Sequence, residues 1–162
     1  MAKKILIGCV VLAAFFVVAV VVLFVWFASS STPRDIEVAV DAPTMVRAGE
    51  EFKIVLRLTN AAAKPQTLVD LDIADSYLDG IVIRSAQPSF SGSDHITRDE
   101  SVSYSFDLKV PARGEATLTL NALAAHPGDF AGDFDFCINN SFSFVTQRVR
   151  TIVREPAEPG RE

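Results

Sequence analysis

The chain has 162 residues, of which 15 are basic and 20 acidic, and it contains only two cysteines. Two of the basic residues, Lys3 and Lys4, lie near the start, so residues 34–162 carry 13 basic and 20 acidic residues, a net charge of −7. This acidity argues against nucleic acid and anionic lipid headgroups as main partners. Because only Cys137 lies beyond residue 33, the sequence excludes a disulfide within that region.

The N-terminal part is an apolar run from Ile5 to Phe27 that contains no charged residue. As a helix it would be about 34 Å long, enough to cross a hydrocarbon core of about 30 Å. Lys3 and Lys4 indicate the cytoplasmic side, and Trp26 lies where an interfacial aromatic residue is favoured. We therefore predict a cytoplasmic basic stub over residues 1–4 and a single-pass signal anchor over residues 5–27. The remaining chain would lie in the periplasm or outside the cell.

Three other interpretations of this run remain open. A signal peptide cleaved after Ser30 would have an apolar region of only about 7–15 residues. A lipobox ending at Cys9 would leave only residues 5–7 as its apolar leader. A prepilin leader ending at Gly8 would usually be followed by Glu five residues later, where this chain has Ala13. The signal anchor fits the length of the run best, and cleavage after Ser30 or Gly8 stays open.

Beyond the run, the sequence predicts a short polar stalk over residues 28–35 and a β-domain over residues 36–154. The C-terminal residues 155–162 are charged and rich in proline, which predicts a disordered tail. Alternation of apolar and polar residues predicts strands, in chain order, near residues 36–40, 52–58, 69–73, 81–83, 102–110, 116–122, 130–138 and 141–153.

Some details of this pattern are specific enough to be tested. Val69, Leu71 and Ile73 are expected to share one apolar face, and residues 87–100 form the longest segment without regular structure. A change of apolar register in the last strand predicts a bulge near Phe144. Seven to nine short strands, with no helix outside the anchor, predict an antiparallel, Ig-like β-sandwich.

Two segments resemble bacterial Ig-like domains of the CARDB-like, cell-adhesion-related kind. The segment Val46-Arg47-Ala48-Gly49-Glu50-Glu51-Phe52 through Leu58-Thr59-Asn60 is similar to the opening of those domains, a Gly-Glu turn followed by a strand ending in Thr-Asn. The later segment from Pro111 to Leu120 is similar to their Pro-Ala-Gly turn and next strand. The resemblance implies an extracytoplasmic binding or spacer module, and it brings no catalytic residues with it.

Few residues in the sequence point to metal or redox chemistry. His95 and His126, the only histidines, have no metal-ligand spacing and are interpreted as solvated loop residues. Asp129, Asp133 and Asp135 lack the positions of an EF-hand loop and are interpreted as solvated carboxylates, with Ca²⁺ binding as the alternative. We interpret Cys137 as a buried, small apolar residue. We therefore predict no metal and no cofactor.

The catalytic patterns are equally sparse. Ser101, Ser103 and Ser105 fall on the outward face of a predicted strand, a poor position for a nucleophile that needs a base. No phosphate-binding glycine loop or nucleophile elbow appears. The sequence thus predicts no enzyme.

The sequence favours a non-enzymatic, membrane-anchored module that binds another envelope protein. Phe130, Phe134 and Phe142 are the candidate partner contacts, with burial in the core as the competing interpretation. The alternatives are a pilin-like structural subunit and a surface carbohydrate-binding module. The second alternative is weakened because Tyr77 and Tyr104 are the only tyrosines and Tyr104 is expected to face inward. The pattern does not indicate an oligomeric state.

Overall fold

The computed structural model describes residues 15–23, 33 and 35–156, which belong to two compact units, Met1–Ser31 and Thr32–Glu162. In the first unit, residues 15–23 form a solvent-exposed helix. Among the described residues, no helix combines the length and the apolar character that crossing a bilayer requires. Most of the predicted anchor, with Lys3, Lys4 and Trp26, lies outside the described residues. The same is true of most of the stalk and of residues 157–162.

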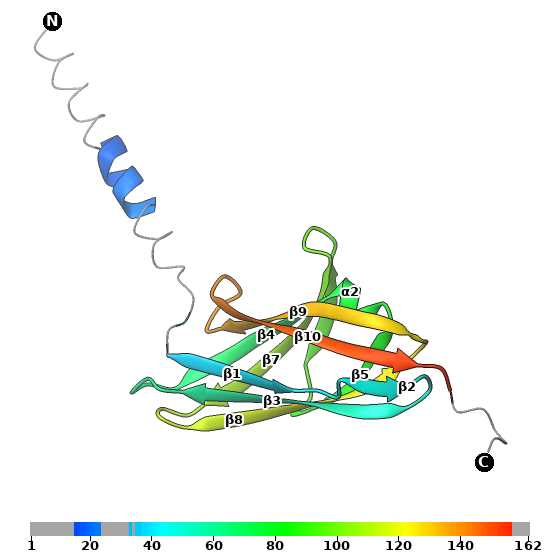
Figure 1. The fold of residues 1–162 in the computed structure, drawn as a ribbon. Helices are drawn as coiled ribbons and strands as arrows, with labels where there is room; N and C mark the ends of the chain where they lie inside the picture. The colour runs from blue at the N-terminus through cyan, green and yellow to red at the C-terminus, as the bar shows by residue number, and fades with distance from the viewer. Residues whose placement is uncertain (1–14, 24–32, 34, 157–162) are drawn as a thin grey trace, which may run out of the picture. The chain divides into compact units, whose positions relative to one another are not determined.

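The second unit is a β-sandwich of two sheets (Figure 1). The four-stranded sheet has the order β1-β3-β8-β5, and the six-stranded sheet has the order β2-β10-β9-β4-β7-β6. In chain order the elements are β1 (Ile36–Asp41), β2 (Met45–Arg47), β3 (Glu51–Asn60), β4 (Gln66–Ala74), α2 (Asp75–Leu78), β5 (Ile81–Gln87), β6 (Gly92–Ile96), β7 (Ser101–Val110), β8 (Glu115–Ala124), β9 (Gly128–Ile138) and β10 (Phe144–Arg154).

The predicted all-β fold is confirmed, with one departure from a purely antiparallel arrangement. The short edge strand β2 pairs in parallel with β10, whereas the other strand pairs are antiparallel. The β2 pairing brings residues 45–47 beside the end of the last strand. This three-residue strand was absent from the predicted set because it is too short to show a period of two.

The core lies between the two sheets and is formed by alternate residues of the long strands. In the four-stranded sheet, Ile54, Leu56 and Leu58 of β3 are fully buried. In the six-stranded sheet, the buried residues include Phe134 and Phe136 of β9. Alternation works here because side chains two positions apart along a strand share one face.

The helix α2 closes one end of this core and is a correction to the predicted absence of helix. Tyr77, on α2, is fully buried and its ring contacts Phe134 edge to face at 5.1 Å. Its hydroxyl is 3.0 Å from that of buried Thr151, and Thr151 donates to the carbonyl of Pro43. A four-residue helix is too short for a recognisable helical period, so the sequence pattern contained no signal for it.

Strand β4 differs from the prediction at one residue. The buried residues are Leu68, Leu71 and Ile73, whereas Val69 is only partly buried. A register shift between Leu68 and Asp70 interrupts the pairing of β4 with both of its neighbours. A bulge adds one residue and so reverses which face the next side chains occupy. The predicted face of Val69, Leu71 and Ile73 was wrong at Val69 for this reason.

Two other predictions are corrected in the same sheet. The segment 87–100, expected to be irregular, contains β6, an edge strand whose side chains are nearly all exposed and therefore show no apolar alternation. The bulge predicted near Phe144 is wrong, because the β9–β10 ladder runs without a shift from Phe144 opposite Cys137 to Val153 opposite Gly128. Phe142 belongs to the preceding loop, and Phe144 is the first, outward-facing residue of β10.

Asn60 fixes the loops at one end of the sandwich. Its buried amide nitrogen donates to the carbonyls of Lys64, Val110 and Pro111, and its Oδ1 accepts from the Ala62 amide and the Gln66 side chain. At the same end, the amide of Ala61 donates to the carbonyl of Asp35, just before β1 begins. We call this the Asn60 end; it comprises Asp35 and the loops 61–65, 111–114 and 139–143.

Candidate functional site

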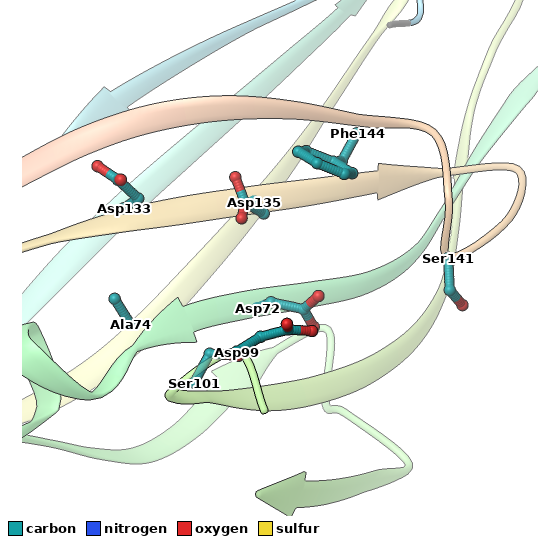
Figure 2. Close-up of a pocket in the computed structure, with 8 residues that line it drawn as sticks. All are labelled: Asp72, Ala74, Asp99, Ser101, Asp133, Asp135, Ser141 and Phe144. Atoms are coloured by element: carbon teal, nitrogen blue, oxygen red, sulfur yellow. The ribbon is translucent and has the colours of Figure 1, made fainter. Parts of the chain in front are cut away.

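The candidate site is an open pocket of about 470 Å³ on the outer face of the six-stranded sheet. Figure 2 shows its lining residues, which come from β4, β7, β9, β10 and the loops before β7 and β10. They reach this face because the intervening residues of β4 and β9, such as Ile73 and Phe134, point into the core. The lining residues are Asp72, Ala74, Asp99, Ser101, Asp133, Asp135, Ser141 and Phe144.

Asp72, on β4, is the most perturbed carboxyl of the pocket. Its burial raises the pKa, and the neighbouring charges of Asp70 and Asp135 act in the same direction, while the Ser103 hydroxyl partly offsets them. The Cys137 thiol lies 3.6 Å from Asp72 Oδ2 and donates to it. Asp72 therefore retains a proton more readily than an exposed aspartate does.

Cys137 faces the same side of the sheet as this pocket but is covered. Its side chain is 1% exposed, and the thiol contacts Asp72 Oδ2 and, at 4.0 Å, the carbonyl of Ser141 in the overlying loop. Burial, followed by the negative charge of Asp72, raises the pKa of Cys137 to about 12. The thiol is thus protonated at neutral pH and unsuited to act as a nucleophile. Its interpretation as a buried residue is confirmed.

The three aspartates of β9 form a ladder of polar contacts with β10. Arg148 Nη1 donates to Asp133 at 2.9 Å, and Arg150 binds both oxygens of Asp129. The Thr146 hydroxyl donates to Asp135. The hydrogen bond and charge of Arg150 lower the pKa of Asp129. Within the described residues no group of three metal-ligating side chains forms, so this geometry offers no support for the Ca²⁺ alternative.

The two histidines lie apart and each has a partner of its own. His95 Nε2, on β6, is 2.8 Å from Asp75 Oδ2 on α2. The ring of His126 packs edge to face on Phe130, with 5.5 Å between the ring centroids. In the part of the chain that the structure describes, no hydrogen bond joins Ser101, Ser103 or Ser105 to an imidazole. These residues do not form a nucleophile–base pair here.

The three candidate contact phenylalanines have three different environments. Phe134 is fully buried between the sheets, so as a partner contact it was wrong. Phe130 is partly buried and covers Gly80 and Gly128, where its ring occupies the space that a Cβ would need. Phe142, in the loop before β10, is 72% exposed. Only Phe142 of the three is free to contact another molecule.

Phe144, Asp72 and Asp99 belong to the pocket and were not among the predicted site residues. Phe144 is 44% exposed and forms the aromatic side of the pocket. The sequence held a signal for it, because Val145 and Val149 share the buried face of β10 and place Phe144 on the opposite one. Asp72 and Asp99 are 27 positions apart in a chain rich in acidic residues. No spacing rule relates such positions before the fold is known.

Comparisons with known proteins relate the chain to others by fold alone. No protein-family model matches the chain, and no curated protein matches it significantly. Among similar solved structures is AvmM, described as catalysing macrocyclization in alchivemycin A biosynthesis, with a TM-score of 0.50 and 10% identity over 80% of this chain and 94% of that one.

Two further neighbours are β-sandwich folds at low identity. The CARDB domain of a Pyrococcus furiosus protein, solved with di-metal ions, has a TM-score of 0.47 and 9% identity over 75% of this chain and 94% of its own. A chain of a cohesin–dockerin complex from Clostridium thermocellum has a TM-score of 0.46 and 16% identity over 76% of this chain and 100% of its own. The likeness is one of fold and says nothing about ligands of this chain.

Proposed function

We propose that this chain is a single-pass membrane protein whose β-sandwich lies outside the cytoplasm and binds another envelope protein without catalysing a reaction. The uncharged run of residues 5–27 supports the anchoring. The observation that carries the binding function is the position of Phe144, an exposed aromatic residue beside an open acidic pocket on the outer face of the six-stranded sheet.

The charges and shape of this pocket favour a basic partner segment. Four aspartates line it; Arg148 pairs with Asp133, and the exposed Arg98 lies 4.0 Å from Asp99, which leaves Asp72 and Asp135 without an ion pair among the described residues. A lysine or arginine side chain entering the pocket would meet carboxylates on the sheet and the ring of Phe144 at its side. Complementary charge of this kind mainly sets specificity and association rate, while the aromatic residue supplies apolar contact area. A cation above an exposed ring adds about 0.5–1 kcal/mol.

The chemistry of the pocket supports binding rather than turnover. The carboxyl of Asp72 is covered from one side by the Cys137 thiol, which is itself protonated and buried. Asp133 and Asp135 are engaged by side chains of β10. None of these groups combines an activated nucleophile with a base in the same place.

Site-specific photo-crosslinking in native membranes tests the proposal. A photoreactive amino acid at position 144 of the full-length protein is expected to crosslink to one envelope protein, at a segment containing lysine or arginine. Position 82 is the matched control, because Val82 is 41% exposed, close to the 44% of Phe144, but lies on the four-stranded sheet. Replacing Asp99 by Asn should reduce the crosslink at position 144 several-fold, since it removes one carboxylate from the pocket.

Two results would contradict the proposal. Equal crosslinking at positions 144 and 82 would show that the pocket is not a preferred contact surface. A chain recovered in the soluble fraction of lysed cells, without detergent, would contradict the membrane anchoring and leave the crosslinking result to be judged separately.

A further inference from the structure

The tip of the β9–β10 hairpin, residues 139–143, combines strong exposure with an absence of charge. Phe142 is 72% exposed, more than any other large hydrophobic residue described in the β-domain. No residue from Phe136 to Gln147 is charged, although 22% of the whole chain is. Because the tip carries no charge, Phe142 can enter a less polar environment without a charged group being desolvated with it.

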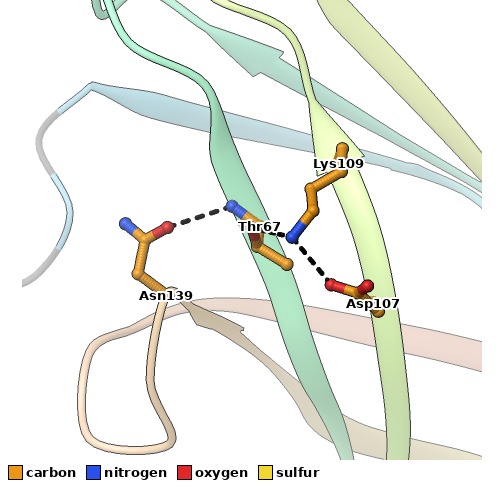
Figure 3. Close-up of polar contacts among 4 residues, drawn as sticks. All are labelled: Thr67, Asp107, Lys109 and Asn139. Atoms are coloured by element: carbon orange, nitrogen blue, oxygen red, sulfur yellow. Dashed lines mark hydrogen bonds and ion pairs between the residues drawn. The ribbon is translucent and has the colours of Figure 1, made fainter.

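Several hydrogen bonds hold this tip in place. Asn139 Oδ1 accepts from the backbone amide of Thr67 at 3.0 Å (Figure 3). The backbone amide of Asn139 donates in turn to the carbonyl of Thr67 at 2.8 Å. Within the loop, Ser141 Oγ donates to Asp70 and the amide of Phe142 donates to Asn140 Oδ1. Figure 3 also shows that Lys109, on the adjacent strand β7, donates to Thr67 Oγ1. The loop therefore presents Phe142 in a defined position.

The position of the tip in the fold relates it to the N-terminal run. The tip belongs to the Asn60 end, where Asp35 is hydrogen-bonded to Ala61. Only residues 28–34 separate Asp35 from the end of the uncharged run. At about 3.5 Å per extended residue, these seven positions span at most about 25 Å. If residues 5–27 cross a bilayer, the length of this segment keeps Asp35 within about 25 Å of the membrane surface, so the Asn60 end is able to reach it.

The charges at the Asn60 end indicate which surface it suits. Lys64 and Arg113 are exposed and form no ion pair with any residue that the structure describes. Asp35 and Glu115 lie at the same end, Asp70 binds Ser141 of the tip and Lys109 pairs with Asp107, so acidic and basic groups are mixed around the tip. A zwitterionic headgroup layer matches such a surface better than a strongly anionic one does.

We propose that the hairpin tip is a lipid contact and that Phe142 inserts into the headgroup region of the membrane that holds the N-terminal run. Aromatic side chains are favoured at this depth. The contact would fix the orientation of the β-sandwich, with α2 and the β8–β9 loop directed away from the bilayer. This inference rests on the proposed anchoring but not on the proposed binding pocket.

Tryptophan fluorescence in vesicles tests this contact with the full-length protein. Trp26 is the only tryptophan, so Trp26→Phe gives a background without tryptophan emission. Phe142→Trp and Val82→Trp are then compared, because Val82 is also exposed but lies near the opposite end of the domain, beside Leu123. Both variants are reconstituted into phosphatidylcholine vesicles with and without brominated lipid. Circular dichroism confirms that both are folded.

The expected result is that brominated lipid removes about half or more of the emission of the Phe142→Trp variant and leaves that of the Val82→Trp variant nearly unchanged. Equal quenching of the two variants would overturn the lipid contact. It would leave Phe142 available to a protein partner instead. Flotation of the vesicles distinguishes a failure of the membrane anchoring from a failure of the lipid contact. Protein that does not float with lipid overturns the anchoring as well, whereas floating Phe142→Trp protein with unquenched emission overturns only the lipid contact.

Discussion

The two sheets of the sandwich use their outer faces differently. In the four-stranded sheet, β3 and β8 pair without a shift from Glu51 opposite Leu123 to Thr59 opposite Glu115, whereas the β5–β8 pairing shifts register between Ile83 and Ser85. In the six-stranded sheet, β4 contains a bulge, and a loop covers the Cys137 thiol on the outer face. All ion pairs found among the described residues lie in the six-stranded sheet, in α2 or in the β6–β7 loop.

This difference shows where the fold departs from simple alternation. A sheet with one buried face and one solvated face needs only a period of two. The six-stranded sheet carries the candidate pocket together with the bulge of β4, a covering loop and paired charges. Irregular pairing occurs in both sheets, since β5 and β8 shift register between Ile83 and Ser85; the covering loop and the ion pairs distinguish the six-stranded sheet. The predictions below test whether the outer face of the six-stranded sheet differs energetically from the rest of the domain.

The largest effect is expected where the two sheets share the core. Phe134→Ala should lower the free energy of unfolding by about 3–5 kcal/mol, because it leaves a cavity and removes the edge-to-face contact with Tyr77. Leu56→Ala, in the four-stranded sheet, should cost about 2–5 kcal/mol. Denaturant unfolding measures both. Phe142→Ala is the control and should change stability by less than about 0.5 kcal/mol; a larger loss would mean that Phe142 packs on the domain.

The reactivity of Cys137 tests the covering loop. In a Cys9→Ser background, the folded protein should react with a thiol reagent at pH 8 about a thousandfold more slowly than the unfolded protein. The reagent attacks the thiolate form, and burial raises the pKa of the Cys137 thiol from 9.0 to about 12. At pH 8 this shift lowers the fraction of thiolate, and with it the reaction rate, about a thousandfold. The rate is followed by mass spectrometry. Comparable rates in the two states would show that the loop 139–143 does not cover the thiol.

Asn60 tests the junction that connects the two sheets. Asn60→Ala should lower the free energy of unfolding by about 2–3 kcal/mol, because it leaves buried backbone groups such as the Val110 carbonyl without a partner. Asn140→Ala is the matched control. Asn140 is exposed and its side chain accepts one hydrogen bond, so its loss should cost less than about 1 kcal/mol. Equal costs for the two variants would contradict a structural role specific to Asn60.

Asp72 should give a pH-dependent effect of smaller size and opposite sign. Because burial raises the pKa of Asp72 above its ordinary value of 3.8, the folded protein binds the Asp72 proton more tightly than the unfolded chain does. Asp72 therefore lowers the stability of the protein as the pH rises above about 3.8. Asp72→Asn should therefore raise the midpoint of thermal unfolding at pH 7, with a gain that shrinks below about pH 4. Asp129→Asn should not stabilise the protein, since Arg150 lowers the pKa of Asp129. A gain from both variants would point to general charge reduction instead.

The smallest effect is expected for the surface ion pairs. Arg148→Ala removes the contact with Asp133, in which both side chains are about half exposed or more, and should cost less than about 1 kcal/mol. The cost should decrease further in high salt, because screening weakens exposed pairs. Lys53→Ala, on the four-stranded sheet, should have no salt-dependent cost. A salt-independent loss at Arg148 would mean that its side chain contributes by packing.

Local pattern was sufficient for much of the fold. The long strands β3, β7 and β8 follow from alternation, and the Asn139-Asn140 turn follows from the tolerance of asparagine for positive φ, which is 65° at Asn139. The pattern failed where a side-chain period was absent or interrupted, as in β2, β6, α2 and the bulge of β4. For the candidate site, the sequence singled out Asp133 and Asp135 but not Phe144 or Asp72, and Phe142 lies outside the pocket, at the hairpin tip.

By itself, the sequence determined the all-β class of the domain, its acidity, the absence of an internal disulfide and the uncharged N-terminal run. These are properties of composition and of neighbours along the chain. Only the tertiary structure decided which phenylalanines are buried, which aspartates are paired and which end of the sandwich carries the exposed tip. Those properties depend on residues from distant strands, such as Asp72, Cys137 and Ser141, being brought together by strand pairing and by a bulge that displaces one strand by a residue.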